Sequence, residues 1–201
     1  MSLKPSTLLI CCAALGLAAC NSGTPAATAD PTVRAAPAQA SVTLLLSSPA
    51  FGEGERIPDE YTCAAAEQGK DHSPQLDWAH APEGTQSFAM LMVDPDANGF
   101  VHWVIYNIPA QAAGLPQAVP NQAALKDGAR QGPNSFGATR DPVGGGTGYS
   151  GPCPPRQHSY TFTLYALDAM LALKAEATHD EVVAAMEGHV LAKAQLRGYF
   201  P

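Results

Sequence analysis

Two long apolar segments separated by a short turn constrain the fold of this chain more than any other feature. Residues 87–94 (SFAMLMVD) are a continuous apolar run of strand length, and residues 101–108 (VHWVIYNI) are rich in β-branched and aromatic residues. A continuous apolar run indicates a strand that is covered on both faces. Residues 95–99 (PDANG) between them have the composition of a turn. The sequence therefore predicts a buried β-hairpin.

The remaining elements predict a mainly β domain. Residues 160–167 (YTFTLYAL) alternate like a strand, and residues 76–78 form another short one. One helix is predicted after Thr178, which forms a capping box with Glu181. Residues 190–196 could continue this helix. Strands first and helix last indicate a β-rich α+β fold, a β-sandwich with C-terminal helical segments.

The first twenty residues are predicted to be an export signal. Lys4 supplies a positive charge, and residues 7–19 are apolar but too short to span a bilayer, which takes about 20 residues. The segment ends in Leu-Ala-Ala-Cys20, which resembles the lipobox of bacterial lipoproteins, where the cysteine carries the lipid. An ordinary signal peptide that contains a cysteine is the alternative. We expect residues 1–20 to be a lipoprotein signal peptide with Cys20 as the lipidated residue.

Residues 21–40 have the composition of a flexible tether, because they lack an apolar period and contain three prolines. Asn21 follows the cysteine where an aspartate would signal retention in the inner membrane. The resemblance to lipoproteins therefore implies an outer-membrane anchor facing the periplasm. Residues 41–201 form the predicted folded domain. The net charge of −7 disfavours nucleic acid as a partner, because an acidic surface repels phosphate backbones.

The positions of the cysteines suggest one disulfide. Cys11 and Cys12 belong to the export signal and Cys20 to the lipobox, so Cys63 and Cys153 remain in the folded domain. The periplasm is oxidising, which makes this pair a disulfide candidate. Two buried free thiols are the alternative.

Four polar clusters could carry chemistry, and each also has a structural explanation. Residues 94–96 (DPD) follow a buried strand, where aspartates often cap turns. His102 lies within an apolar strand, and a lone strand histidine is more often structural than functional. Residues 151–155 (GPCPP) alone indicate only a rigid loop. His158 and Tyr160 are two residues apart at a strand start and therefore share one face.

In this order, the motifs resemble the signatures of the phosphatidylethanolamine-binding protein family. Residues 94–97 (DPDA) and 100–109 (FVHWVIYNIP) are similar to the first signature, and residues 148–155 (GYSGPCPP) and 158–160 (HSY) to the second. Shorter motifs match the bacterial Raf-kinase-inhibitor-like branch, the YbhB/YbcL group, at residues 48–51, 57–58, 61–63 and 185–192. The resemblance covers about residues 41–199 and implies the antiparallel β-sandwich of that family.

The resemblance implies a shallow pocket for a phosphate, a carboxylate or a phospholipid head group. Carried over position by position, its predicted lining is Asp94, Asp96, His102, Gly151, Pro154, Pro155, His158 and Tyr160. Imidazoles and a hydroxyl can donate to oxyanion oxygens, and a glycine allows close approach of the backbone. A neighbouring carboxylate can orient an imidazole and favour its cationic form. We expect a binding protein with no catalytic residues, metal or cofactor.

Two features depart from the family pattern. Many relatives carry an arginine between the histidine and the tyrosine of the second signature, where this chain has Ser159. The loss of that cation is expected to weaken phosphate binding or to change how the strand pairs. Arg140 to Gly146 look like an insertion beside the pocket loop. The preferred ligand therefore stays open.

Two other functions also stay open. Asp94, Asp96, His102 and His158 could bind the zinc or manganese of a hydrolase, since carboxylate and imidazole suit these metals. The sequence contains neither a G-x-S-x-G nucleophile elbow nor a P-loop. The second alternative is an inhibitor or interaction module that acts on an envelope protein. The insertion would then supply the contact surface.

Overall fold

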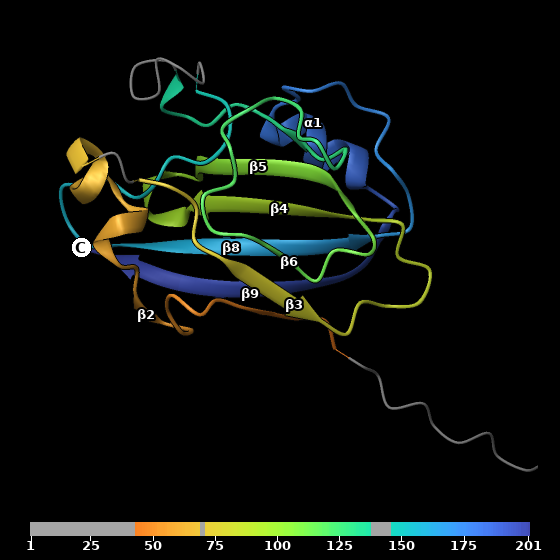
Figure 1. Cartoon of the computed structure of the whole chain (residues 1–201), viewed down its shortest axis with the longest axis horizontal. Coiled ribbons are helices and arrows are strands. Elements are labelled where there is room, and N and C mark those ends of the chain that lie inside the picture. The colour runs from red at the N-terminus through yellow and green to blue at the C-terminus, as the bar shows by residue number, and fades with distance from the viewer. Residues whose placement is uncertain (1–42, 69–70, 138–145) are drawn as a thin grey trace, which may run out of the picture. The chain divides into compact units, whose positions relative to one another are not determined.

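The computed structural model describes residues 43–68, 71–137 and 146–201, which form two β-sheets and one short α-helix (Figure 1). This confirms the predicted mainly β fold class. The expected signal peptide and tether lie outside the described residues, as does the expected insertion except for Gly146.

The larger sheet contains six strands in the order β2-β9-β8-β4-β5-β7. Neighbouring strands are antiparallel, except that β2 and β9 run parallel. Figure 1 shows β5, β4, β8 and β9 side by side. The strands are β2 (Glu55–Arg56), β4 (Ser87–Asp94), β5 (Phe100–Pro109), β7 (Arg130–Gln131), β8 (His158–Leu167) and β9 (Val190–Phe200). The predicted hairpin is confirmed as β4 and β5.

The smaller sheet has three antiparallel strands in the order β1-β3-β6. They are β1 (Leu45–Ser47), β3 (Leu76–Ala79) and β6 (Gly114–Leu115). Three short 3₁₀ helices lie in the described connections, namely η1 (Asp59–Tyr61), η2 (Cys63–Gln68) and η3 (Pro95–Ala97).

Two apolar layers cover the opposite faces of the larger sheet. On one face, residues of the smaller sheet such as Trp78 pack with Phe88 of β4 in the main core. On the other face, Val182 and Met186 of α1 (His179–Met186) pack with Leu91 of β4. Successive residues of a strand point to opposite faces. Because both faces of β4 are covered, its sequence is apolar almost without interruption.

The C-terminal region differs from the prediction. The capping box is confirmed, because the Thr178 side chain accepts from the Glu181 N–H while Glu181 accepts from the Thr178 N–H. The expected helical continuation over residues 190–196 is wrong, because that segment lies in β9. Alanine, lysine, glutamine and leucine favour helix locally. Here, pairing with β8 along the whole of β9 overrides that preference, and Ala192 and Ala194 pack against the core.

The segment between β5 and Phe136, which contains the short strands β6 and β7, contributes a buried polar residue. Gln131 is fully buried, and its Oε1 accepts from Trp103 Nε1 at 2.7 Å. Its Nε2 donates to the carbonyls of Pro120 and Gln122, each at 2.8 Å. This side chain therefore joins an otherwise irregular segment to the main core.

Gln131→Met keeps the volume of the side chain but removes the acceptor for the buried indole N–H and the donor for two carbonyls. We expect the free energy of unfolding to fall by about 1–3 kcal/mol, the usual cost of buried groups left unpaired. Urea unfolding with the disulfide intact measures it. Gln122→Met, at an exposed side chain, is the control and should change stability by less than about 0.5 kcal/mol. Equal losses in both variants would contradict this role of Gln131.

Candidate functional site

A small cavity lies where β4 ends and where β5 and β8 begin. Its volume is about 170 Å³. It is lined by Asp94, Ala97, Phe100, His102, Phe136, Cys153, Pro154, Pro155, His158 and Tyr160. The antiparallel pairing of β4 with both neighbours brings these strand ends together, with Asp94 opposite Phe100 and Val93 opposite Thr161.

A buried carboxylate fixes the His158 ring. His158 Nδ1 donates to Asp94 Oδ2 at 2.7 Å. The other oxygen, Oδ1, accepts the Ala97 N–H at 3.0 Å and so caps η3. Asp94 is only 3% exposed. Because a carboxylate can only accept, the ring proton sits on Nδ1, and Nε2 can donate to a ligand only when the ring is protonated.

His102 is held in one orientation by its backbone partner and by aromatic rings. Its Nδ1 donates to the Ser150 carbonyl at 2.7 Å, and the Ser150 N–H donates back to the His102 carbonyl at 3.0 Å. The imidazole packs edge-on against Tyr160, with ring centroids 5.1 Å apart, and against Phe136 at 5.5 Å. Both histidines therefore present fixed rings to one cavity.

The structure brings together most of the predicted pocket residues but not Asp96 or Gly151. The cavity includes the predicted Asp94, His102, Pro154, Pro155, His158 and Tyr160. Asp96 lies outside its lining and is exposed. Its Oδ2 accepts the Ser159 N–H at 2.7 Å, which ties η3 to the start of β8. This hydrogen bond, helped by the charges of His158 and Arg156, holds the pKa of Asp96 below its ordinary value.

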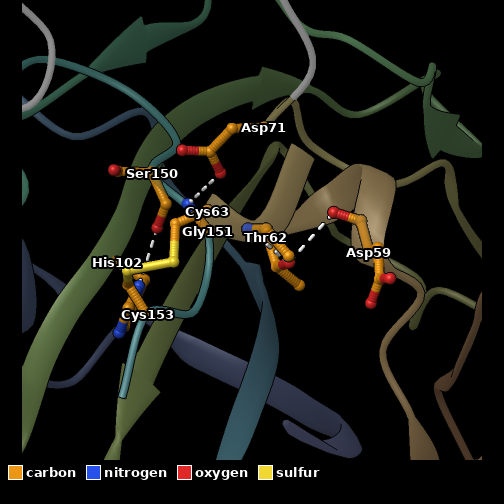
Figure 2. Close-up of a disulfide and its surroundings, with 9 residues drawn as sticks. Asp59, Thr62, Cys63, Asp71, His102, Ser150, Gly151 and Cys153 are labelled. Atoms are coloured by element: carbon orange, nitrogen blue, oxygen red, sulfur yellow. Dashed lines mark hydrogen bonds between the residues drawn. A yellow bond between two sulfur atoms is a disulfide. The ribbon is translucent and has the colours of Figure 1, made fainter. Parts of the chain in front are cut away.

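Gly151 has a different role from the one predicted. Its N–H donates to Asp71 Oδ1 at 2.8 Å (Figure 2). A Cβ at this position would clash with the backbone carbonyl of Tyr61. The close approach that requires glycine is therefore made to the backbone near η1, not to the cavity.

Ser159 does not disturb the strand that carries His158 and Tyr160. β8 and β9 pair in register there, with Ser159 opposite Tyr199. Ser159 is exposed, whereas both of its neighbours are buried. Alternate residues of a strand point to opposite faces, so the Ser159 side chain points away from the cavity. β8 therefore pairs with β9 without a register shift at Ser159.

Four lining residues were missed from the sequence, namely Ala97, Phe100, Phe136 and Cys153. Phe100 directly precedes the predicted second strand, so extending that strand by one residue would have included it. The Phe100 and Phe136 rings lie 4.7 Å apart and nearly perpendicular, forming an apolar wall. Phe136 comes from an irregular loop that is anchored by a hydrogen bond from the Phe136 N–H to Asn134 Oδ1.

Cys63 and Cys153 are joined as a disulfide, with their Cα atoms 5.3 Å apart (Figure 2). Cys153 also lines the cavity and is exposed. The bond therefore connects η2 with the wall of the site.

No group of three or more histidine, cysteine, aspartate or glutamate side chains is placed to hold a metal ion in the part of the chain that the structure describes. Within the same residues, no helix is long and apolar enough to cross a membrane.

The described residues thus form two packed β-sheets with a small cavity at the strand ends that is lined by two histidines. The chain belongs to the phosphatidylethanolamine-binding protein family, whose model matches residues 47–201.

Relatives from archaea and bacteria cover the same region. The chain is 44% identical over 158 residues to a UPF0098 protein of Methanothermobacter thermautotrophicus, covering 77% of this chain and 97% of the relative. A UPF0098 protein of Aquifex aeolicus is 41% identical over 159 residues, covering 76% and 85%.

Two solved structures are similar to this chain. The phosphatidylethanolamine-binding protein homologue CT736 of Chlamydia trachomatis superposes with a TM-score of 0.68 at 30% identity, covering 80% of this chain and 99% of its own. YbcL of Escherichia coli, described as a new member of the mammalian family, gives a TM-score of 0.64 at 28% identity, covering 78% and 97%.

Asp96→Asn tests whether the charge on this carboxylate ties η3 to β8. A carboxylate whose folded-state pKa is lowered adds stability above its unfolded-state pKa of about 3.9, and this is lost as the pH falls through the folded-state value. We therefore expect Asp96→Asn to lower the melting temperature at pH 7, and the difference from wild type to shrink as the pH falls below the ordinary range of an aspartate. Glu187→Gln, at an exposed carboxylate after α1, is the control. A difference that is the same at every pH would refute the charge effect.

Proposed function

We propose that this chain is a non-enzymatic envelope protein that binds a small anionic group, such as the phosphate of a phospholipid head group. The observation that carries the proposal is the buried His158–Asp94 pair, whose imidazole lines the same cavity as His102. With both rings protonated and Asp94 ionised, the two cations outweigh the single carboxylate. This would give an acidic protein a locally positive site.

The shape of the cavity supports a small ligand. Pockets for drug-sized molecules usually measure about 300–1,000 Å³, whereas this cavity measures about 170 Å³. Phe100, Phe136 and the two prolines supply apolar walls around the polar end. An anion that carries one small apolar or aliphatic substituent fits this combination better than a long acyl chain does.

Two features support a location in the envelope. Residues 1–20 have the pattern of a lipoprotein signal with Cys20 at its end. Disulfides persist mainly in oxidising compartments, so the Cys63–Cys153 bond agrees with export. We therefore place the domain on a lipid anchor in the outer membrane, facing the periplasm.

Sulfate is the chosen probe because its own charge is constant between pH 5 and 8. Any change of its affinity with pH therefore reports protonation of the protein. We expect the full chain to bind sulfate in calorimetric titrations and the affinity to be lower at alkaline than at acidic pH, since Nε2 of His158 donates only when the ring is protonated. His158→Gln should weaken binding at acidic pH by at least about tenfold, the loss of one charge-assisted hydrogen bond. Full affinity in this variant would rule out the proposed site.

His189→Gln is the matched control for that experiment. His189 Nδ1 also pairs with a carboxylate, Asp168, at 2.8 Å, but the pair is half exposed and lies outside the cavity. This variant should bind sulfate like the wild type. An equal loss in both variants would mean that general charge, not the cavity, attracts the anion.

Metal binding would give the opposite dependence on pH. Imidazole ligands must be deprotonated to hold zinc, so zinc affinity rises with pH. Native mass spectrometry of the full chain with added zinc and with phosphoethanolamine separates the two functions. We expect the phosphoethanolamine adduct. A stoichiometric zinc adduct that is lost in His102→Gln would overturn the proposal in favour of a metal-dependent hydrolase.

A further inference from the structure

Residues 149–152 directly precede the cavity-lining residues 153–155 and are hydrogen-bonded to Tyr61, Cys63 and Asp71. The Tyr149 hydroxyl donates to the Tyr61 carbonyl at 2.6 Å. The Gly151 N–H donates to Asp71, and the Cys63 N–H donates to the Pro152 carbonyl at 3.0 Å. These bonds hold residues 149–152 against η1 and η2.

The residue that follows, Cys153, lines the cavity and is linked to η2 by a covalent bond. Cys153 is bonded to Cys63, and Figure 2 draws this disulfide together with the Asp71–Gly151 and His102–Ser150 hydrogen bonds. Pro154 and Pro155 follow directly and also line the cavity. Proline has no backbone N–H, so neither residue can hold the wall by donating a hydrogen bond. The disulfide is therefore well placed to fix the proline wall.

We propose that the Cys63–Cys153 disulfide is a redox-sensitive clamp on the anion pocket. Its reduction releases residues 153–155 and weakens anion binding while the two sheets stay folded. The inference rests on the proposed function of the pocket and adds a form of regulation to it. The residue on the cavity side, Cys153, is exposed, and Cys63 is half-buried, so a reductant has access without global unfolding.

The chemistry requires a dithiol, the class of reductant that exchanges with protein disulfides. One thiolate of the dithiol attacks the sulfur of Cys153, and the Cys63 sulfur leaves as a thiolate that takes up a proton. The second thiol of the reductant then loses its proton and attacks the mixed disulfide, which releases the Cys153 thiolate to be protonated. Two electrons and two protons pass to the protein, and the dithiol ends as a disulfide.

The hydrogen bonds that remain explain why the effect should be local. Tyr149, Ser150 and Gly151 keep their partners after reduction, and neither apolar layer contains a cysteine or proline of the proposed clamp. The reduced chain still loses thermal stability, because the cross-link restricts the unfolded state. A test must therefore separate the loss of binding from the loss of stability.

The test measures the sulfate affinity of the full chain at one acidic pH before and after treatment with dithiothreitol. Near-ultraviolet circular dichroism reports the fold, and thiol labelling reports complete reduction. We expect the reduced, folded chain to bind sulfate at least about tenfold more weakly, with recovery on reoxidation. Cys63→Ser combined with Cys153→Ser should bind as weakly as the reduced chain and should not respond to dithiothreitol.

Val182→Ala is the stability control. Val182 belongs to α1 and is fully buried in the apolar layer on the other face of the larger sheet. Its truncation therefore lowers stability without changing the cavity lining. This variant should keep wild-type sulfate affinity. A reduced, folded chain with unchanged affinity would refute the clamp alone, and so would unfolding of the domain on reduction. An oxidised chain that binds no sulfate would refute the proposed function itself.

Discussion

The position of β4 between β5 and β8 is the constraint on which the rest of the structure depends. β4 is paired on both edges and covered on both faces, by the smaller sheet and by α1. The observed register places Asp94 opposite Phe100 of β5 and Val93 opposite Thr161 of β8, so Asp94 lies at the end of β4 near the first residues of both neighbours.

This placement lets one buried carboxylate serve two purposes. Asp94 caps η3 through one oxygen and orients His158 through the other. A buried charge is costly unless it is paired and hydrogen-bonded. The Ala97 N–H in the turn after β4 and the His158 ring of β8 meet this requirement by donating to the two oxygens of Asp94. The geometry of the cavity and the stability of the turn are thus linked through the same side chain.

Local signals account for the parts of the fold that could be predicted. The hairpin, β8 and the capping box follow from apolar pattern and turn chemistry over a few neighbouring residues. The segment that became β9 shows the limit, because its composition favours a helix and only the free edge of β8 makes it a strand. That edge is formed by residues distant in the sequence.

The residues of the site likewise divide into those that local motifs predicted and those that they did not. The signature motifs pointed to the two histidines, Tyr160 and the prolines, which lie on strands or in a rigid loop. Phe136 was missed because its position depends on long-range contacts with β5. Gly151 and Asp96 were assigned to the cavity because their motifs contain them. The structure instead uses one for backbone packing and the other to tie η3 to β8.

The order of the strands also has a consequence for biosynthesis. β9 lies between β2 and β8, although it is translated after all of its sheet neighbours, and it pairs Phe200 with His158. Contacts between residues far apart in sequence form slowly, since long loops must close first. A nascent chain therefore leaves the outer edge of β8 unpaired until β9 arrives, and an unpaired strand edge can template aggregation.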